Sequence, residues 1–266
     1  METNTVRASS SPRHVPTRLL LLGGTGEAAM LAERLAQKPN LQVISSLAGR
    51  VNTPKLPAGI VRSGGFGGVP GLMAYLQDEG IDLVVDATHP FAAQMSRHAE
   101  MACQAIGLPL LAYARPPWTP VSGDQWEEVS DFALAAELIQ RRKGRVFLAI
   151  GRQELAAFSE CSETHFVVRA IDPPEILPPN ATLVLDRGPF QLEAELEMLR
   201  HHRIDYIVSK NSGGSATYSK IEAARRLGLP VMMIQRPKKH TGPTIGDLPT
   251  LLDRIGTLLR EHSDSL

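Results

Sequence analysis

Cysteine, net charge and long apolar runs are all scarce in this chain. Its two cysteines, Cys103 and Cys161, are too few for a disulfide scaffold or a cysteine-based zinc site. Its 28 Lys and Arg balance its 28 Asp and Glu, so the sequence lacks the broad positive field that binds nucleic acid or anionic membranes. No apolar run approaches the roughly 18 residues of a membrane span, and no apolar signal core precedes the first strand. We expect a cytoplasmic protein without nucleic-acid or membrane partners.

The 266 residues, 43% of them hydrophobic, suit two small domains or one large one. Residues 1–17 mix Ser, Thr, Pro and Arg without periodicity and are predicted to form a flexible leader. Short apolar runs then alternate with amphipathic stretches, which is typical of parallel strands covered by helices. Prolines within 115–120 interrupt this pattern and indicate a linker. We predict two Rossmann-like α/β domains, 18–117 and 118–262, with parallel sheets and an interdomain cleft.

The expected elements follow from hydrophobic periodicity. Strands are predicted at 19–22, 41–46, 60–62, 82–86 and 108–113, and then at 145–150, 164–169, 183–186, 205–209 and 230–235. Helices are predicted at 27–38, 70–79, 91–106, 131–142, 189–202, 215–227 and 247–261.

A glycine-rich turn joins the first expected strand to the first helix. Gly24, Gly26 and Ala29 fit the pattern G-x-G-x-x-G/A. Glycines let the backbone approach a pyrophosphate, which would sit at the positive end of the helix. A turn that binds nothing is the alternative, but the α/β setting favours a dinucleotide site. The candidate cofactor residues here are Gly23, Gly24, Thr25, Gly26 and Glu27.

The end of the second expected strand bears on which dinucleotide binds. An NAD site usually has a carboxylate there, whereas this chain has Ser45, Ser46 and then Arg50. Hydroxyls followed by an arginine suit the additional phosphate of NADP(H). The alternative is a simple strand end with a solvated arginine, and we favour NADPH.

Two further loops follow strands of the first domain. Gly64 and Gly65 belong to a loop that can lie flat against a ligand, or that is only a flexible crossover. Thr88 and His89 follow the fourth strand, where the nicotinamide end of a cofactor is expected. His89 is a candidate proton donor or, alternatively, a structural hydrogen-bonding residue.

The second domain has a polar loop between a strand and a helix. Backbone donors, hydroxyls and two lysines converge there and suit an anionic group, although an ordinary helix cap by Ser212 or Ser215 is the alternative. Arginines at strand ends would together bind a polyanion, although each alone is more often solvated. The candidate residues are Lys210, Asn211, Ser212, Gly213, Gly214 and Lys220, with Arg115, Arg152 and Arg187. No metal constellation is visible.

Several motifs together resemble one known family. They are GGTGEA at 23–28, SLAGR at 46–50, GGFGG at 64–68, DATHPFA at 86–92, YARP at 113–116, RGPF at 187–190 and SKNSGG at 209–214, with Lys220 and LGLPVMMIQRP at 227–237. In this combination the chain resembles the precorrin-6A reductase family of cobalamin biosynthesis, from about residue 18 to 237.

The resemblance implies a fold of two α/β domains with cofactor and tetrapyrrole between them. It implies NADPH-dependent reduction of one double bond of the precorrin-6A macrocycle to give precorrin-6B. The substrate's carboxylates would contact His89, the candidate residues of the polar loop, Lys220 and the three arginines. Candidate proton donors are His89, Lys210 and Tyr218, or solvent.

Two other functions stay open at this point. A short-chain reductase would usually present Tyr-x-x-x-Lys, and here only Tyr206 and Lys210 have that spacing, in a strand-to-loop context. A non-catalytic NADP sensor would leave the polar loop at 209–214 unexplained. The presence of cobalt in the substrate, the hydride stereochemistry and the oligomeric state are not specified by the sequence.

Overall fold

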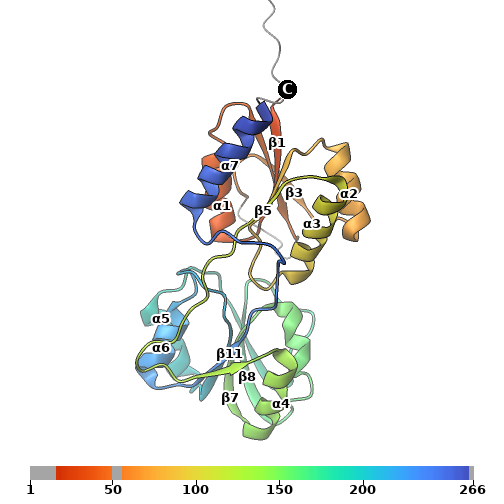
Figure 1. Ribbon diagram of the computed structural model, residues 1–266. Helices are drawn as coiled ribbons and strands as arrows, with labels where there is room; N and C mark the ends of the chain where they lie inside the picture. Colours follow the sequence, from red (N-terminus) through yellow and green to blue (C-terminus); the bar gives the residue numbers. More distant parts are fainter. Residues whose placement is uncertain (1–15, 50–55, 264–266) are drawn as a thin grey trace, which may run out of the picture.

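The computed structural model describes residues 16–49 and 56–263, which form two α/β units, each built on one parallel sheet (Figure 1). This confirms the predicted fold class. Of the predicted leader, residues 1–15 lie outside the described residues, and Thr17 already begins the first strand. Arg50 also lies outside them.

The first sheet has the strand order β3-β2-β1-β4-β5, and all its pairings are parallel. Ile245 extends it beyond β5, because its N–H donates to the Ala112 carbonyl (2.8 Å) and its carbonyl accepts from the Ala114 N–H (2.9 Å). The strands are β1 (Thr17–Leu22), β2 (Leu41–Leu47), β3 (Ile60–Ser63), β4 (Leu83–Asp86) and β5 (Leu110–Ala112).

Four consecutive leucines in β1 serve both faces of this sheet. Leu19 and Leu21 pack toward one helix layer, while Leu20 and Leu22 pack toward the other. Each is essentially fully buried, which is worth about 1.5–3 kcal/mol per side chain. The first layer contains α1 (Gly26–Leu35) and α7 (Leu248–Ser263), and the second contains α2 (Gly68–Asp78) and α3 (Ala93–Ile106).

The second sheet has the order β6-β11-β10-β7-β8-β9, again wholly parallel. One face is covered by α4 and the 3-10 helix η1, and the other by α5 and α6. The strands are β6 (Trp126–Val129), β7 (Gly144–Ala149), β8 (Thr164–Ala170), β9 (Ala181–Leu185), β10 (Tyr206–Lys210) and β11 (Val231–Ile234). The helices are α4 (Phe132–Arg142), η1 (Arg152–Phe158), α5 (Leu192–His201) and α6 (Ser219–Leu227).

Each sheet reverses its strand order at one point, beside β1 in the first and beside β7 in the second. Ligands of open α/β sheets bind at the carboxyl ends of the strands around such a switch point. The first sheet's switch lies between the β1–α1 and β4–α3 loops, and the second sheet's between the loops after β7 and β10. Two connections, at 113–125 and 235–247, run between the sheets (Figure 1).

The second connection returns the chain to the first unit. The chain that leaves the first sheet forms β6, the first strand of the second unit, which pairs with β11 at the sheet edge. The chain that leaves the second sheet returns through Ile245 to the β5 edge of the first. The first unit is therefore completed by a segment that follows the second along the chain.

Some elements differ from the expected ones. β6 was not predicted, because its sequence Trp-Glu-Glu-Val is too polar for an apolar-run signal. η1 was not predicted either, and α6 begins at Ser219 rather than at 215. The expected second domain included 248–262, yet α7 packs against α1 on the first sheet (Figure 1). The domain boundaries themselves stay a prediction.

The packing of α7 predicts a stability effect for Ile255. This side chain is fully buried among first-sheet core residues. Ile255→Ala is expected to lower the free energy of unfolding by about 2–5 kcal/mol, measured by urea denaturation. Arg254→Ala, at an exposed position of the same helix, is the matched control. Equal stability of the two variants would contradict the packing.

Candidate active site at the junction of the two sheets

The glycine turn after β1 presents an open backbone surface. Gly24 has φ 98°, and a Cβ added at Gly24 or Gly26 would meet no atom within 4 Å. The Thr25 hydroxyl accepts from the Ala28 N–H at the start of α1 (3.1 Å) and donates to the Ala87 carbonyl (3.0 Å). Thr25 thus caps α1 and ties the turn to the end of β4, while the glycines leave room for a ligand.

The end of β2 lies directly beside this turn. The Gly23 N–H donates to the Ser46 carbonyl (3.0 Å), and the Ser45 hydroxyl is buried without a hydrogen-bond partner in the described structure. Arg62, at the end of β3, donates to the Ser46 hydroxyl (2.7 Å). Arg50, predicted to bind the additional phosphate, lies outside the described residues. Arg62 was not among the residues predicted from the sequence, although an arginine that ends an expected strand was a usable signal.

The second glycine loop is also open to ligands. A Cβ added at Gly64 or Gly65 would meet no atom within 4 Å. The Gly64 N–H donates to the Leu47 carbonyl (2.9 Å), which joins this loop to the end of β2. The two predicted glycine loops therefore flank one strand end.

A buried carboxylate ends β4. Asp86 is fully buried, and its Oδ1 accepts from the Thr88 N–H (2.9 Å) and the Thr88 hydroxyl (2.6 Å). His240 Nε2 lies 2.9 Å from Oδ2, and Lys239 Nζ lies 3.6 Å from Oδ1. Lys239 also donates to the Thr88 carbonyl (3.1 Å). Asp86, Lys239 and His240 form a latch, as we call it, between the returning connection and the first sheet.

The latch keeps Asp86 ionised. Burial acts to raise the pKa of Asp86, but its contacts outweigh that effect and hold the pKa well below its ordinary value. The lowering contacts come from His240, Lys239, Ser96 and Thr88. Lys239 and His240 were not predicted from the sequence, because polar residues in an irregular connection leave no periodic signal.

His89 is a neutral side chain in a cationic environment. Burial lowers its pKa to about 2, with smaller contributions from nearby cations. Its Nδ1 accepts from the Phe91 N–H (3.2 Å), so the ring proton lies on Nε2. As a neutral imidazole, His89 can donate a hydrogen bond from Nε2 but holds no imidazolium proton near pH 7. The cations are Lys210, Arg115, Lys239 and Arg236.

The polar loop of the second sheet contacts the glycine turn through Arg115. Arg115 donates to both carboxylate oxygens of Glu27 (2.7 Å each) and to the Ser212 carbonyl (2.7 Å). A Cβ at Gly214 would lie 3.1 Å from Glu27 Oε1. The predicted cofactor turn and the predicted substrate loop therefore meet at one junction.

Two more residues fasten this loop to the connections. The Asn211 side chain accepts from the Trp118 N–H (2.8 Å) and donates to the Trp118 carbonyl (3.0 Å). Arg236 donates to the carbonyls of Asn211 and Arg115 (2.7 Å each). Both connections and the loop thus form one hydrogen-bonded network.

The other predicted side chains lie at varying depth. Lys210 pairs with Glu154 (3.1 Å) and lies 5.3 Å from the ring centre of Phe91, which comes from the first sheet. Lys220 is 4% exposed and donates to the Thr217 carbonyl (2.7 Å), and burial lowers its pKa to about 7. Lys220 therefore supports the start of α6 from inside.

Tyr218, Arg152 and Arg187 complete the set. The Tyr218 hydroxyl accepts from Arg225 (2.6 Å), and Tyr218 is the N-cap residue of α6 without a side-chain cap. The alternative of a cap by Ser212 or Ser215 is therefore not what the structure contains. Arg152 opens η1 and Arg187 is exposed after β9, both at the carboxyl edge of the second sheet.

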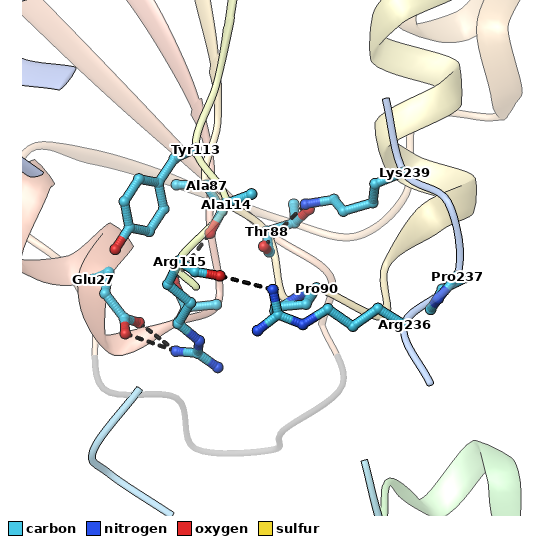
Figure 2. A pocket seen from close by; sticks show the side chains of 11 residues that line it. Glu27, Ala87, Thr88, Pro90, Tyr113, Ala114, Arg115, Arg236, Pro237 and Lys239 are labelled. Carbon is cyan, nitrogen blue, oxygen red and sulfur yellow. Dashed lines mark hydrogen bonds and ion pairs between the residues drawn. The ribbon is translucent and has the colours of Figure 1, made fainter. Parts of the chain in front are cut away.

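A pocket opens between the glycine turn, the end of β4 and the two connections (Figure 2). The Lys239 side chain reaches toward Thr88 across it, and Arg236 reaches the Arg115 carbonyl. Its wall includes Thr25, Thr88, Tyr113, Arg115, Arg236 and Lys239. Open glycine backbone and several cations at one place suit an anionic nucleotide together with a second anionic ligand.

Two searches of the described structure were negative. Residues 16–49 and 56–263 contain no cluster of three or more His, Cys, Asp or Glu side chains arranged to hold a metal ion. None of the helices in that part of the chain is both long and apolar enough to span a membrane.

Comparison with known proteins gives consistent matches. The family model described as Precorrin-6x reductase CbiJ/CobK matches residues 18–255. Precorrin-6A reductase from Rhodococcus erythropolis is 49% identical over 246 residues, which cover 92% of this chain and 99% of the relative. Precorrin-6A reductase from Sinorhizobium sp is 47% identical over 240 residues, or 90% and 92% of the two chains. The solved structure of CobK precorrin-6A reductase has a TM-score of 0.86 and 45% identity, covering 91% of this chain and 97% of that chain.

The latch predicts that Asp86→Asn destabilises the protein. The substitution removes the carboxylate charge from a site where Lys239 stays buried, which typically costs about 3–5 kcal/mol. Urea denaturation at pH 7 measures the effect. Asp78→Asn, at an exposed position of α2, removes the same charge without a buried partner and is the control. A loss no greater than that of the control would refute the latch.

His89 predicts an acid-dependent loss of stability. Its pKa is about 2 in the folded protein and about 6.5 in an unfolded chain, so between these values the unfolded state binds more protons. Stability therefore falls as pH decreases below about 6.5. In urea denaturation at pH 7.5 and pH 5, His89→Gln is expected to lose less stability over this interval than the wild type. The difference in stability between the two proteins at pH 7.5 gives the cost of lost packing. If both proteins lose the same stability between pH 7.5 and pH 5, His89 does not cause the acid-dependent loss.

Proposed function

Because the chain belongs to the precorrin-6x reductase CbiJ/CobK family, we propose that it reduces precorrin-6A in cobalamin biosynthesis, with NADPH as the hydride donor and precorrin-6B as the product. The protein is accordingly an oxidoreductase. The observation that carries the proposal is the junction of Glu27, Arg115 and Ser212, which brings the glycine turn of the first sheet against the polar loop of the second. Cofactor and substrate would meet there.

The residues of the first sheet fit a dinucleotide. The open backbone at Gly24 and Gly26 would receive the pyrophosphate at the N-terminus of α1, the positive end of the helix dipole. Thr88 and the pocket beside it would hold the nicotinamide end. When bound, NADPH supplies the hydride, and the protein orients the two partners.

The second sheet would bind the tetrapyrrole. The family resemblance implies a macrocycle with acetate and propionate carboxylates, which guanidinium and ammonium groups recognise. Arg152 and Arg187 lie at its carboxyl edge, and Lys210 lies at its switch point. In this proposal Arg115 acts mainly through the junction, because Glu27 already neutralises it. Both relatives are named for precorrin-6A without cobalt, which favours a metal-free substrate.

Among the predicted proton donors, the contacts favour Lys210. His89 is neutral, and the Tyr218 hydroxyl is engaged by Arg225. Lys210 pairs with Glu154 (3.1 Å), but it also faces Phe91 of the first sheet, so its ammonium lies where the two ligands would meet. We propose that it delivers the proton that accompanies hydride transfer.

A cytoplasmic location also stays a prediction.

A short-chain reductase mechanism is disfavoured by the position of Tyr206. Its hydroxyl donates to the Lys143 carbonyl (3.0 Å) at the start of β7. Lys210 is four residues further along β10, or about 13 Å in an extended strand. Tyr206 and Lys210 therefore do not form a catalytic pair. A sensor without turnover would bind NADPH and leave precorrin-6A unreduced.

The proposed function predicts that the wild-type protein oxidises NADPH when precorrin-6A is added. The decrease in NADPH absorbance measures this reaction. Lys210→Met is expected to lower kcat by about 10²- to 10⁴-fold with a smaller change in KM, because it removes the proton donor. Lys38→Met removes a lysine at an exposed position just after α1 and should keep wild-type turnover. If the wild-type protein does not oxidise NADPH, the proposed function is rejected. Full activity of Lys210→Met would reject only the role of Lys210 as proton donor.

A further inference from the structure

We infer that Arg62, at the end of β3, binds the 2′-phosphate of NADP(H) and makes the nucleotide site select this dinucleotide over NAD(H). The inference rests on the proposed NADPH dependence and adds the residue that determines the selectivity. It differs from the expectation for Arg50, which lies outside the described residues.

The position of Arg62 is the first argument. Its guanidinium donates to the Ser46 hydroxyl (2.7 Å), and the Ser46 carbonyl accepts from Gly23 of the glycine turn (3.0 Å). In dinucleotide-binding sheets the strand next to the one that leads into the glycine turn, here β2, ends beside the adenosine ribose. A carboxylate there selects the 2′-hydroxyl of NAD, and a nearby arginine accommodates the 2′-phosphate of NADP. β2 ends in Ser45, Ser46 and Leu47, without a carboxylate.

The charge of Arg62 is the second argument. Within 16–49 and 56–263, its hydrogen bonds go only to neutral oxygens, the Ser46 hydroxyl and the carbonyls of Gly64 (3.1 Å) and Gly65 (3.0 Å). Arg18 and Arg115 of the same unit each pair with a glutamate instead. A half-buried cation without a carboxylate partner is costly, and burial accordingly lowers the pKa of Arg62. A phosphate dianion would supply the missing counter-charge.

The orientation of Arg62 is the third argument. Its guanidinium lies 3.8 Å from the ring centre of Phe66 and 5.0 Å from that of Tyr75, so the side chain is already fixed in place. In the described structure three of its five N–H groups are engaged. The Nε–H and one Nη2 hydrogen are left, and they can grip a phosphate as a fork. No atom lies within 4 Å of a Cβ added at Gly64 or Gly65, so the loop over Arg62 leaves room for this group.

Dissociation constants for NADP⁺ and NAD⁺, measured by isothermal titration on the full chain, test the inference. Arg62→Gln is expected to weaken NADP⁺ binding by about 10- to 100-fold and to change NAD⁺ binding by less than about threefold. Arg62→Lys should fall between the wild type and Arg62→Gln, because lysine keeps the charge without the fork. Arg34→Gln, at an exposed position of α1, is the control for a lost positive charge. Thermal unfolding without nucleotide reports any damage to the loop.

The outcomes separate the possible roles of Arg62. If Arg62 only shapes the glycine loop, Arg62→Gln will weaken both dinucleotides by the same factor, and the inference is overturned. An unchanged preference for NADP⁺ would overturn it as well, while leaving the proposed cofactor intact. A wild-type protein that binds neither dinucleotide would overturn both this inference and the proposed NADPH dependence.

Discussion

The ion pair between Glu27 and Arg115 holds together the two surfaces on which the rest of the site depends. Glu27 lies in the first turn of α1, and Arg115 lies in the connection that leaves β5 and reaches Ser212 beyond it. The two side chains are 18% and 14% exposed, so their attraction is screened less than that of a surface pair. Gly213 lies so close that a Cβ would be 2.1 Å from the Pro116 carbonyl. The carboxyl edges of the sheets are therefore held at contact distance.

The charges around this junction are distributed unevenly, although the chain as a whole is neutral. Asp86 is a buried anion that pairs with Lys239. His89, which lies near both Lys239 and Lys210 of the second sheet, is uncharged. Burial, together with the nearby cations, keeps His89 from taking a proton. An anionic ligand entering the pocket would meet donors that are already positioned, which reduces the reorganisation that binding requires.

The sequence was most informative where the chain is periodic. Apolar runs such as the leucines of β1, and glycines next to helix starts, predict both parallel sheets and their loops, because these patterns arise from local geometry. The strand Trp126–Val129 gave no such signal, since its polar sequence forms no apolar run and its partner β11 lies far along the chain. Lys239 and His240 were missed for the same reason. Their partner Asp86 is more than 150 residues away, and only the tertiary fold brings them together.

The return of the chain to the first sheet after β11 has a consequence for how this architecture can be divided. A fragment ending in the first connection would contain β1 to β5 but would lack Ile245, which extends the β5 edge, and α7, which packs on the same face as α1. The complementary fragment would contain every strand of the second sheet, from β6 onward, and would carry α7 without the sheet that this helix covers. The first unit is therefore assembled from both ends of the described chain, so that a cut in either connection separates α7 from its sheet.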